Sequence, residues 1–462
     1  MSAAGDVEAW LDSHSIHTVR TLGVSHDGIA VGKHLARRKF GKAIETGAAM
    51  SDFVYGFDLG GTPMVGWWAD WRTSHLGDML QMPDPSTLMP TPWQPGVALC
   101  LADHTDVSGR PLPVCTRSIV RRLTEHLAGL GFEARMSIEV EAMIFTEPMD
   151  VARARGFRGL SPLGGPRPAL FYSAIRGHEY DTFMSELRRR LDAMEIPWEA
   201  TNAEAALGQV EINVEASDPV TTADRTVVVR QMFREVALDL GHTVTFMAKP
   251  VAETFGGGAH IHHSLWTDGA PAFYDASHPD GRSEVWRHWL GGLMATLPGS
   301  VSLLAPFVTS FRRFVDFIAS PTTATWCEDN KSTAVRTITA RGPALARIEH
   351  RVAASDANPY LTVATVLAGG IAGLEEQLEP PPEFRYIAWG VPDHVPRLPT
   401  TILSAADALA GDERLTRLLG PEFVEHWVRS RKWEWLMFHT TGGDPAASDV
   451  TDWELIRYFE QV

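Results

Sequence analysis

The sequence predicts an α+β protein built from two parts, and two patterns in its 462 residues carry that prediction. Up to about residue 108, short stretches alternate apolar and polar residues, which is typical of half-buried strands. From Thr116 onward, apolar residues recur every three or four positions and predict amphipathic helices, with a few alternating strands between them. We therefore expect a small domain over residues 1–108 and a larger domain over residues 109–462.

In the smaller part, the patterns predict more strand than helix. The turn residues His26–Gly28 separate two alternating stretches, and prolines punctuate the extended stretch that follows them. The expected elements are a helix at Asp6–Ser13, strands within Thr18–Val31, extended chain over Leu76–Trp93 and a strand at Val97–Ala102.

In the larger part, long helical patterns enclose a few strands. Several Gly, Pro and Arg residues over Met149–Arg167 predict a loop. The expected strands are Ser137–Phe145 and Gln209–Glu215. The expected helices are Ser118–Leu130, Glu179–Met194, Thr222–Leu240, Trp286–Leu297, Pro359–Leu378, Leu403–Leu419 and Glu422–Glu434.

Composition and charge narrow the class of protein. With 41 basic and 57 acidic residues, the formal net charge is −16, which argues against non-specific nucleic-acid binding because phosphates need a basic face. No apolar stretch approaches the ~20 residues that span a bilayer, and the polar N-terminal residues lack the apolar core of a signal peptide. Three sparse cysteines argue against a disulfide framework. We expect a cytoplasmic protein without a nucleic-acid or membrane partner.

The expected strand Ser137–Phe145 has one apolar face and one acidic face. Glu139 and Glu141 share the acidic face, about 7 Å apart at Cα from a rise of roughly 3.3 Å per residue. Two carboxylates this close raise each other's pKa unless a cation lies between them. Taken alone, the strand is equally consistent with a half-exposed strand that carries solvated glutamates.

Three further segments place polar residues on one strand face: Glu204–Glu211, Gly256–His263 and Arg347–Arg351. In the second segment, three glycines, where backbone can approach a ligand closely, precede His260 and His262. Each segment alone has a simpler explanation, such as a hydrogen-bonded histidine pair or a salt-bridged strand face. Together they supply, with the strand above, five carboxylates and a histidine, which are hard ligands that suit two Mg²⁺ or Mn²⁺ ions better than zinc.

Cationic residues near positions 312–336 complete the predicted chemistry. Arginine and lysine side chains suit phosphate and carboxylate groups. Two metal ions beside a cationic clamp are typical of phosphoryl transfer from a nucleotide. The sequence contains no P-loop motif, so the nucleotide would be held in another way.

Five motifs follow one another along nearly the whole chain. They read Glu-x-Glu, Glu…Gly-Gln-x-Glu, Lys-Pro…Gly-x-His-x-His, Asn-Lys-Ser…Arg and Arg-Ile-Glu-x-Arg…Asn-Pro-Tyr. This order resembles the class I glutamine synthetase family. The resemblance implies an N-terminal β-grasp domain and a catalytic domain on a curved antiparallel sheet flanked by helices. It also implies a homo-oligomer, a dodecamer of two stacked hexameric rings with active sites between neighbouring subunits.

The resemblance assigns metal and substrate roles by position. The implied first metal site is Glu141, Glu204 and Glu211. The implied second metal site is Glu139, His260 and Glu349. The residues that hold glutamate are Arg313 and Arg351, with the backbone of Gly256. The phosphate-stabilising positions are Lys331, Arg336 and Arg347. The nucleotide site consists of His262 and Ser264, together with the same two arginines.

Departures from the family pattern gather around the pocket for the attacking nitrogen. The family's flap motif corresponds to Ser310–Pro321, which we call the flap segment, and the flap glutamate that helps deprotonate ammonium is replaced by Ala319. The asparagine before the glycine-rich strand is replaced by Phe255. Losing a carboxylate and gaining apolar area favours a primary amine with an organic substituent over ammonium. The remaining bases are Glu204 and Asp58, the latter only if the alignment includes a gap.

The predicted activity is ATP-dependent ligation of the γ-carboxylate of L-glutamate to a primary amine through γ-glutamyl phosphate. ATP and two Mg²⁺ or Mn²⁺ ions would serve the reaction. We favour a small monoamine, such as ethanolamine or an alkylamine, with an aromatic amine next. A polyamine would need a further carboxylate, for which Asp316 is the candidate. Three alternatives stay open: a glutamine synthetase that uses ammonia, a γ-glutamylpolyamine synthetase, and a non-catalytic regulatory paralogue.

Overall fold

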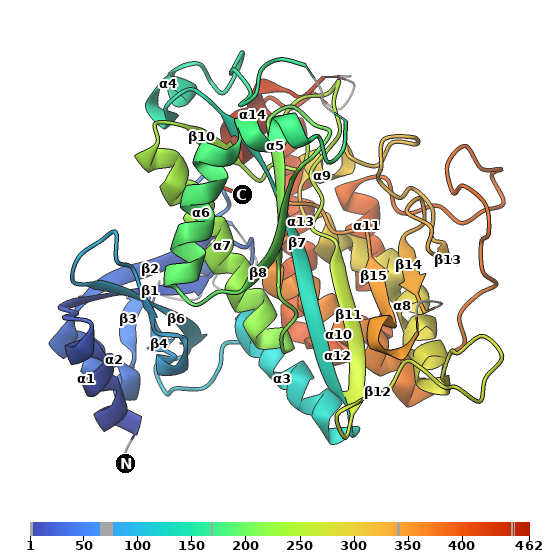
Figure 1. The fold of residues 1–462 in the computed structure, drawn as a ribbon, viewed down its shortest axis with the longest axis horizontal. Coiled ribbons are helices and arrows are strands. Elements are labelled where there is room, and N and C mark those ends of the chain that lie inside the picture. The colour runs from blue at the N-terminus through green and yellow to red at the C-terminus, as the bar shows by residue number, and fades with distance from the viewer. Residues whose placement is uncertain (1–2, 65–76, 168–169, 340–341, 445–446, 448) are drawn as a thin grey trace.

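The computed structural model describes residues 3–64, 77–167, 170–339, 342–444, 447 and 449–462 (Figure 1). Within these residues, the chain forms two sheets with helices packed around them, which confirms the α+β class. One sheet uses strands from residues 18–105 and the other uses strands from residues 133–350, so they fall on either side of the proposed division at residues 108/109. Residues 65–76 of the Gly- and Trp-rich stretch lie outside the described residues.

The first sheet is six-stranded, in the order β2-β1-β6-β4-β3 with β5 on β6. Its central strands β1 and β6 run parallel, and the other pairs are antiparallel. Helices α1 and α2 cover the sheet through the buried Leu11 and Phe40. The elements are α1 Ala3–Ser13, β1 Thr18–Val24, β2 Ala30–Ala36, α2 Arg37–Thr46, β3 Ala48–Ser51, the 3₁₀ turns Asp52–Tyr55 and Pro85–Thr87, β4 Asp78–Pro83, β5 Met89–Pro90 and β6 Val97–Thr105.

The second sheet is nine-stranded, in the order β13-β14-β15-β11-β7-β9-β8, with β10 on β7 and β12 on β11. It is antiparallel as expected except at one edge, where β13 and β14 run parallel. Its strands are β7 Glu133–Phe145, β8 Trp198–Ala203, β9 Gln209–Val214, β10 Thr243–Thr245, β11 Ile261–Thr267, β12 Ala270–Pro271, β13 Trp326–Glu328, β14 Val335–Ile338 and β15 Arg347–His350.

Helices pack around the second sheet, and Figure 1 shows β7 and β11 running side by side through the middle of the molecule. Helix α10 packs against α3, α7 and α8. The helices are α3 Thr116–Gly129, α4 Met149–Ala154, α5 Ala174–Glu179, α6 Asp181–Ala193, α7 Pro219–Asp239, α8 Glu284–Leu304, α9 Val308–Phe311, the 3₁₀ turn Pro343–Leu345, α10 Pro359–Glu376, α11 Ile402–Ala410, α12 Glu413–Leu419, α13 Pro421–Thr440 and α14 Asp452–Tyr458.

Several predicted boundaries were wrong: the predicted helix Leu403–Leu419 is two helices, α11 and α12, and α13 runs past the predicted Glu434 to Thr440. A short helix, α4, occupies the start of the predicted loop over Met149–Arg167. Helix α8 continues through Pro298 to Leu304 because its buried face packs on α10 at close range. A Cβ on Gly292 would lie 2.1 Å from the carbonyl oxygen of Gly369, so this helix crossing requires glycine.

The alternation predicted for β7 is confirmed. Ile138, Val140 and Ile144 are at most 3% exposed and belong to the main hydrophobic core beneath the sheet. Burying these side chains on one face leaves Glu139 and Glu141 on the other, because successive side chains of a strand point to opposite faces. Among the residues with described structure, no helix combines the length and the apolar character needed to cross a membrane.

Candidate active site

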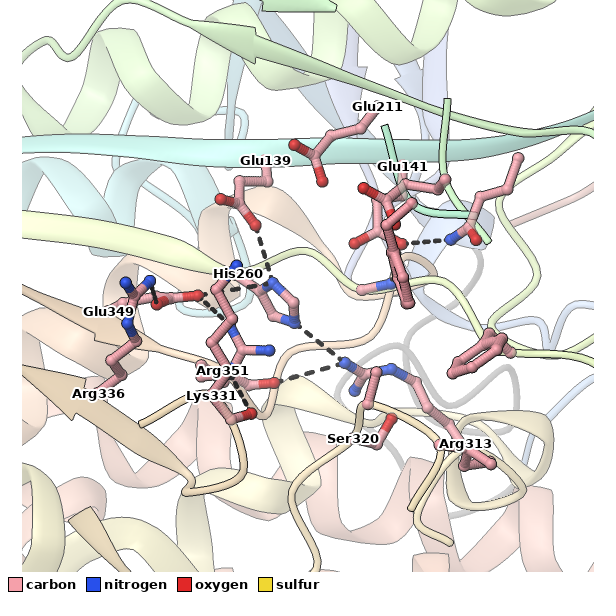
Figure 2. Close-up of a pocket in the computed structure, with 18 of the residues that line it drawn as sticks. Glu139, Glu141, Glu211, His260, Arg313, Ser320, Lys331, Arg336, Glu349 and Arg351 are labelled. Carbon is pink, nitrogen blue, oxygen red and sulfur yellow. Dashed lines mark hydrogen bonds and ion pairs between the residues drawn. The ribbon is translucent and has the colours of Figure 1, made fainter. Parts of the chain in front are cut away.

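A cavity of about 370 Å³ opens over the polar face of the second sheet (Figure 2). Strands β7, β9 and β15 provide four of its acidic residues, whereas Glu204 follows β8 and His260 immediately precedes β11; loops provide most of its cationic and apolar residues. Thirteen of the predicted site residues line it: Glu139, Glu141, Glu204, Glu211, Phe255, Gly256, His260, Arg313, Ala319, Lys331, Arg336, Glu349 and Arg351.

The pairing of β7 with β9 brings three carboxylates together. Glu141 lies directly opposite Glu211, and Glu139 lies opposite Asn213. Oxygens of Glu139, Glu141 and Glu211 all lie within 4.8 Å of one another, as a metal ion would require. The first predicted metal site contained Glu204 in place of Glu139; Glu204 lines the same cavity but is not part of this group.

A second group of donors combines residues of β7 and β15 with the residue just before β11. Atoms of Glu139, His260 and Glu349 lie within 4.8 Å of one another, which is the trio predicted from the sequence. Nδ1 of His260 lies 2.8 Å from a Glu139 oxygen and 3.8 Å from a Glu349 oxygen. Both groups therefore share Glu139, which Figure 2 shows between Glu211 and His260.

The electrostatics of the first group fit a cation. Burial, followed by the negative charge of Glu204, raises the pKa of Glu141 to about 8. Burial and the charges of Glu139 and Glu141 raise the pKa of Glu211 to about 9, and burial with Glu139 raises that of Glu204 to about 7. Burial and mutual repulsion both disfavour the charged forms of these side chains, and a cation among them would favour those forms. Oxygen donors in this arrangement fit Mg²⁺ or Mn²⁺.

Glu349 has the opposite environment because two arginines contact it. Arg336 donates to one oxygen at 2.9 Å, and Arg351 donates to the other. Burial opposes ionisation of this side chain, but the nearby Arg351 outweighs it and lowers the pKa of Glu349 to about 2. Glu349 is 1% exposed and stays ionised across the physiological range.

The glycine-rich loop before β11 brings backbone close to the acidic residues. The N–H of Gly258 donates to Glu141 at 2.9 Å. A Cβ on Gly258 would lie 2.8 Å from Nε2 of His260 and 3.1 Å from both Glu141 and Arg313. Arg313 is 2% exposed, donates to the Val352 carbonyl oxygen at 2.9 Å, and burial lowers its pKa to about 10.

The three other residues assigned to the nucleotide or phosphates extend from the cavity along the same sheet face. Nε2 of His262 lies 3.0 Å from Glu139, and Nε of Arg347 lies 3.4 Å from Nδ1 of His262. The hydroxyl of Ser264, two residues further along β11, accepts a hydrogen bond from the Trp266 indole at 3.0 Å. None of His262, Ser264 and Arg347 is among the residues that line the cavity.

Asp58 lies outside the cavity of its own chain. Its carboxylate contacts Arg457 at 3.0 Å and accepts a hydrogen bond from the Trp433 indole at 2.9 Å. Backbone N–H groups of Gly60 and Thr62 also donate to it, so the side chain closes a turn. Asp58 therefore cannot act as a base in this cavity without a second copy of the chain.

Several lining residues were not predicted to belong to the site. Gln209 donates to Glu141 and faces the cavity from β9; its spacing of two residues from Glu211 on one strand was a usable signal. The others lie on loops, where no periodic pattern indicates which way a side chain points. They are Phe171, Tyr172, Ile318, Ser320 and Trp389.

Comparison with known proteins identifies the family. Residues 113–458 match a family model described as glutamine synthetase, catalytic domain. The chain is 31% identical to a glutamate–isopropylamine ligase of Pseudomonas sp, over 98% of this chain and 97% of that protein. It is 30% identical to the γ-glutamylethanolamide synthetase GlnA4 of Streptomyces coelicolor, over 99% of this chain and 96% of that protein. It is 29% identical to a γ-glutamylanilide synthase of Acinetobacter sp, over 99% of this chain and 95% of that protein.

A solved structure described as apo GmaS without ligand agrees with these relatives. It superposes with a TM-score of 0.82 at 26% sequence identity, over 98% of each chain. The similarity thus covers both sheets and nearly every element described above. The chain belongs to the glutamine synthetase family.

Proposed function

We propose that the protein is an ATP-dependent ligase that joins the γ-carboxylate of L-glutamate to a primary amine. One observation carries the proposal: a single cavity combines two groups of metal-type donors with an apolar wall at the place where the family's flap glutamate is missing. The relatives named for isopropylamine, ethanolamide and anilide products support the same reaction class.

Two divalent ions, Mg²⁺ or Mn²⁺, are proposed to sit at the two donor groups with Glu204 as a further ligand. When bound, such ions neutralise the oxygens of a phosphoryl group in transfer. The chain's own cations Lys331, Arg336 and Arg347 are proposed to stabilise the phosphate oxygens, and His262 and Ser264 to contact the nucleotide.

Glutamate is proposed to lie between Arg313, Arg351 and the backbone of Gly256. All three line the cavity, and Arg313 is the nearer of the two arginines to the glycine loop, 3.1 Å from a Cβ built at Gly256. In this position the γ-carboxylate can accept the phosphoryl group of ATP, and the resulting γ-glutamyl phosphate is then attacked by the amine.

The attacking amine is proposed to enter beside Ala319 and to lose its proton to Glu204. Glu204 lines the cavity, and the side-chain amide of Asn202 donates to its carboxylate at 2.8 Å and so fixes its orientation. Ammonium needs several carboxylates or hydroxyls around it, whereas Phe255 and Ala319 present apolar surface at this side.

We also propose that the protein forms a dodecamer and is cytoplasmic. A dodecamer of two hexameric rings would let Asp58 of one subunit approach the cavity of its neighbour, which a single chain does not allow. A cytoplasmic location is consistent with three buried, unbridged cysteines, at Cys100, Cys115 and Cys327.

The proposal is tested by incubating the protein with L-glutamate, ATP and Mg²⁺ and a panel of amines. ADP release is measured together with the amide product by mass spectrometry. We expect amine-dependent ADP release and an equal amount of γ-glutamylamide, both lost in Glu349→Gln. A highest kcat/KM with ammonia would instead indicate a glutamine synthetase. No turnover with any nucleophile, by a protein that still binds ATP or glutamate, would indicate the regulatory paralogue.

A further inference from the structure

The cavity has an apolar wall beside its acidic groups. Six lining residues form this wall, and none of them carries a charge at neutral pH. They are Phe171, Tyr172, Phe255, Ile318, Ala319 and Trp389. They come from four separate segments: the loop before α5, the glycine-rich loop, the flap segment and the stretch before α11. Four segments distant in sequence thus contribute apolar side chains to this one cavity.

Two phenylalanines form one side of the wall. The rings of Phe171 and Phe255 pack edge to face, with centroids 5.5 Å apart and planes at 73°. The loop that carries Phe171 is anchored to the sheet because the N–H of Tyr172 donates to the carbonyl oxygen of Ala203 at 3.0 Å. Phe171 nevertheless remains 45% exposed, so a ligand with an apolar group can still bury part of this ring.

Trp389 forms the other side together with the flap segment. Its indole N–H donates to the backbone carbonyl oxygen of Ser320 at 2.8 Å, so the polar atom of the ring is already satisfied. Phe317 packs against it with centroids 5.9 Å apart. The ring is therefore fixed in place, and what it offers the cavity is apolar surface.

A second positive charge on the substrate would find no free carboxylate among the residues of this chain that are described at the wall. Asp316, the candidate for that role, accepts hydrogen bonds from the Thr322 hydroxyl and from the N–H of Gly390 at 2.9 Å, and it contacts Arg397 at 3.4 Å. Asp316 is not a lining residue. Among the described lining residues, the carboxylates are the five proposed metal ligands.

We infer that the amine substrate is a primary monoamine whose substituent is apolar and either aromatic or branched. This inference rests on the proposed function and adds the substrate class. The substituent packs between Phe171, Phe255 and Trp389. It is selected because the wall offers apolar surface and no free carboxylate. A second ammonium group placed there loses water and finds no free carboxylate among the described lining residues, whereas an apolar group gains contact area.

The test compares kcat/KM for benzylamine and isopropylamine with kcat/KM for ethanolamine, 1,4-diaminobutane and ammonia, at saturating glutamate and ATP. We expect the two apolar amines to exceed the other three by roughly tenfold or more, since one methylene in an apolar pocket is worth about that much. If ethanolamine, the diamine or ammonia is the best nucleophile, this inference is wrong while ATP-dependent ligation stands. If no nucleophile supports turnover, the proposed function itself fails.

A pair of neighbouring variants assigns the effect to the wall. Phe171→Ala removes a wall residue, and Leu170→Ala removes an apolar residue that is 84% exposed and does not line the cavity. We expect Phe171→Ala to raise the KM for benzylamine and to lower its kcat/KM, relative to that for methylamine, by roughly tenfold. Leu170→Ala should keep the ratio. An equal loss for both amines in Phe171→Ala would contradict selection by this ring.

Discussion

Glu139 is the residue at which the two donor groups of the cavity meet. Its oxygens lie 2.8 Å from His260 and 3.0 Å from His262, and it is also grouped with Glu141 and Glu211. The two histidines lower the pKa of Glu139 against the effect of burial, so it is ionised where its neighbours on β7 and β9 are not. Because it belongs to both groups, Glu139 would be available as a ligand at either one if an ion binds there.

The protonated glutamates give the metal-free protein an unusual pH dependence of stability. The pKa values of Glu141 and Glu211 are about 8 and about 9 in the folded protein, against 4.5 for an ordinary glutamate. Between pH 4.5 and about pH 9 the folded protein binds more protons than the unfolded chain, so its free energy of unfolding falls as pH rises. In EDTA, we expect the temperature at the midpoint of thermal unfolding to be lower at about pH 8.5 than at about pH 6.5.

Mn²⁺ should reverse this trend, because the ion binds the deprotonated carboxylates and its stabilisation therefore grows with pH. Differential scanning fluorimetry at several pH values, with and without the ion, measures both effects. Glu211→Gln serves as the matched variant and should flatten the dependence in EDTA. A metal-free protein that becomes more stable toward pH 8.5 would refute the clustering of these carboxylates.

Substitution of Ala319 is expected to change the preference between ammonia and bulky amines most strongly. Its backbone lies in the left-handed region with φ 63°, and a glutamate there is no more strained at Cβ than the alanine is. We expect Ala319→Glu to lower kcat/KM for bulky amines roughly tenfold by filling the space, and to raise that for ammonia by a similar factor. Ala319→Gln fills the same space without the charge and should lose bulky amines without gaining ammonia. Unchanged selectivity in both variants would count against this account of the pocket.

Among the site residues, those on strands were predicted best from the sequence. A period of two places Glu139 with Glu141, and His260 with His262, on one face wherever the opposite face is apolar. The residues that were missed, such as Phe171 and Trp389, lie on loops whose path depends on distant partners. For Asp58, sequence supplied the residue but not its ion pair with Arg457, which lies about 400 positions further along the chain.

At the scale of elements, the glycine-rich loop sets the distance between β7 and the residues that face it. The N–H of Gly258 holds Glu141, and the absence of a side chain at this position lets His260 and Arg313 approach. The register of β11 against β7, with Ile261 opposite Ile138, then directs His262 and His260 toward Glu139. A shift of one residue would turn these side chains to the core face.

Gly258→Ala tests the role of this loop. The added Cβ would come within 2.8 Å of His260, so the donor groups must separate. We expect the affinity for Mn²⁺, measured by calorimetry, to fall roughly 10- to 100-fold, as when a partner of a metal ligand is removed. Gly177→Ala on α5 is the control, since a Cβ there meets nothing within 4 Å. Equal affinities in both variants would show that the loop does not position the ligands.

Sequence predicted the long helices better than the short elements. Helices α7 and α10 have extended periodic patterns and capping residues, Asp218 and Asn358, that accept hydrogen bonds from their first turns. By contrast, α2, β3, β8 and α14 are short and were not predicted. Their formation depends on packing against the first sheet, β9 and the second hydrophobic cluster, which no local pattern records.

At the scale of the whole molecule, one buried arginine ties the first sheet to the helices of the second. Arg117 on α3 is 3% exposed and donates to Asp224 on α7 with two hydrogen bonds, at 2.8 and 2.9 Å. It also donates to Asp84 and Asp103, both at 2.8 Å, which belong to the first sheet and its turn. Tyr360 on α10 donates to the same Asp224 at 2.6 Å.

Removing this arginine leaves the buried Asp224 without its cation, whereas the partly exposed Asp84 and Asp103 keep their ion pairs with Arg121. We expect Arg117→Ala to lower the free energy of unfolding by about 3–5 kcal/mol, as for other broken buried ion pairs. Arg110→Ala is the control, because its side chain is 82% exposed and its pairing with Asp106 is screened by water. Thermal and urea unfolding compare the two; equal, small shifts would show that the network does not join the two sheets.

The transfer of oxygen from glutamate to phosphate tests the central claim most directly. L-Glutamate labelled with ¹⁸O in its γ-carboxylate is incubated with ATP, Mg²⁺ and a primary amine, and the inorganic phosphate is examined by mass spectrometry. If the cavity activates glutamate as γ-glutamyl phosphate, each amide formed releases one phosphate carrying one ¹⁸O atom. Unlabelled phosphate, or ATP hydrolysis that proceeds without amide, would contradict ligation at this site.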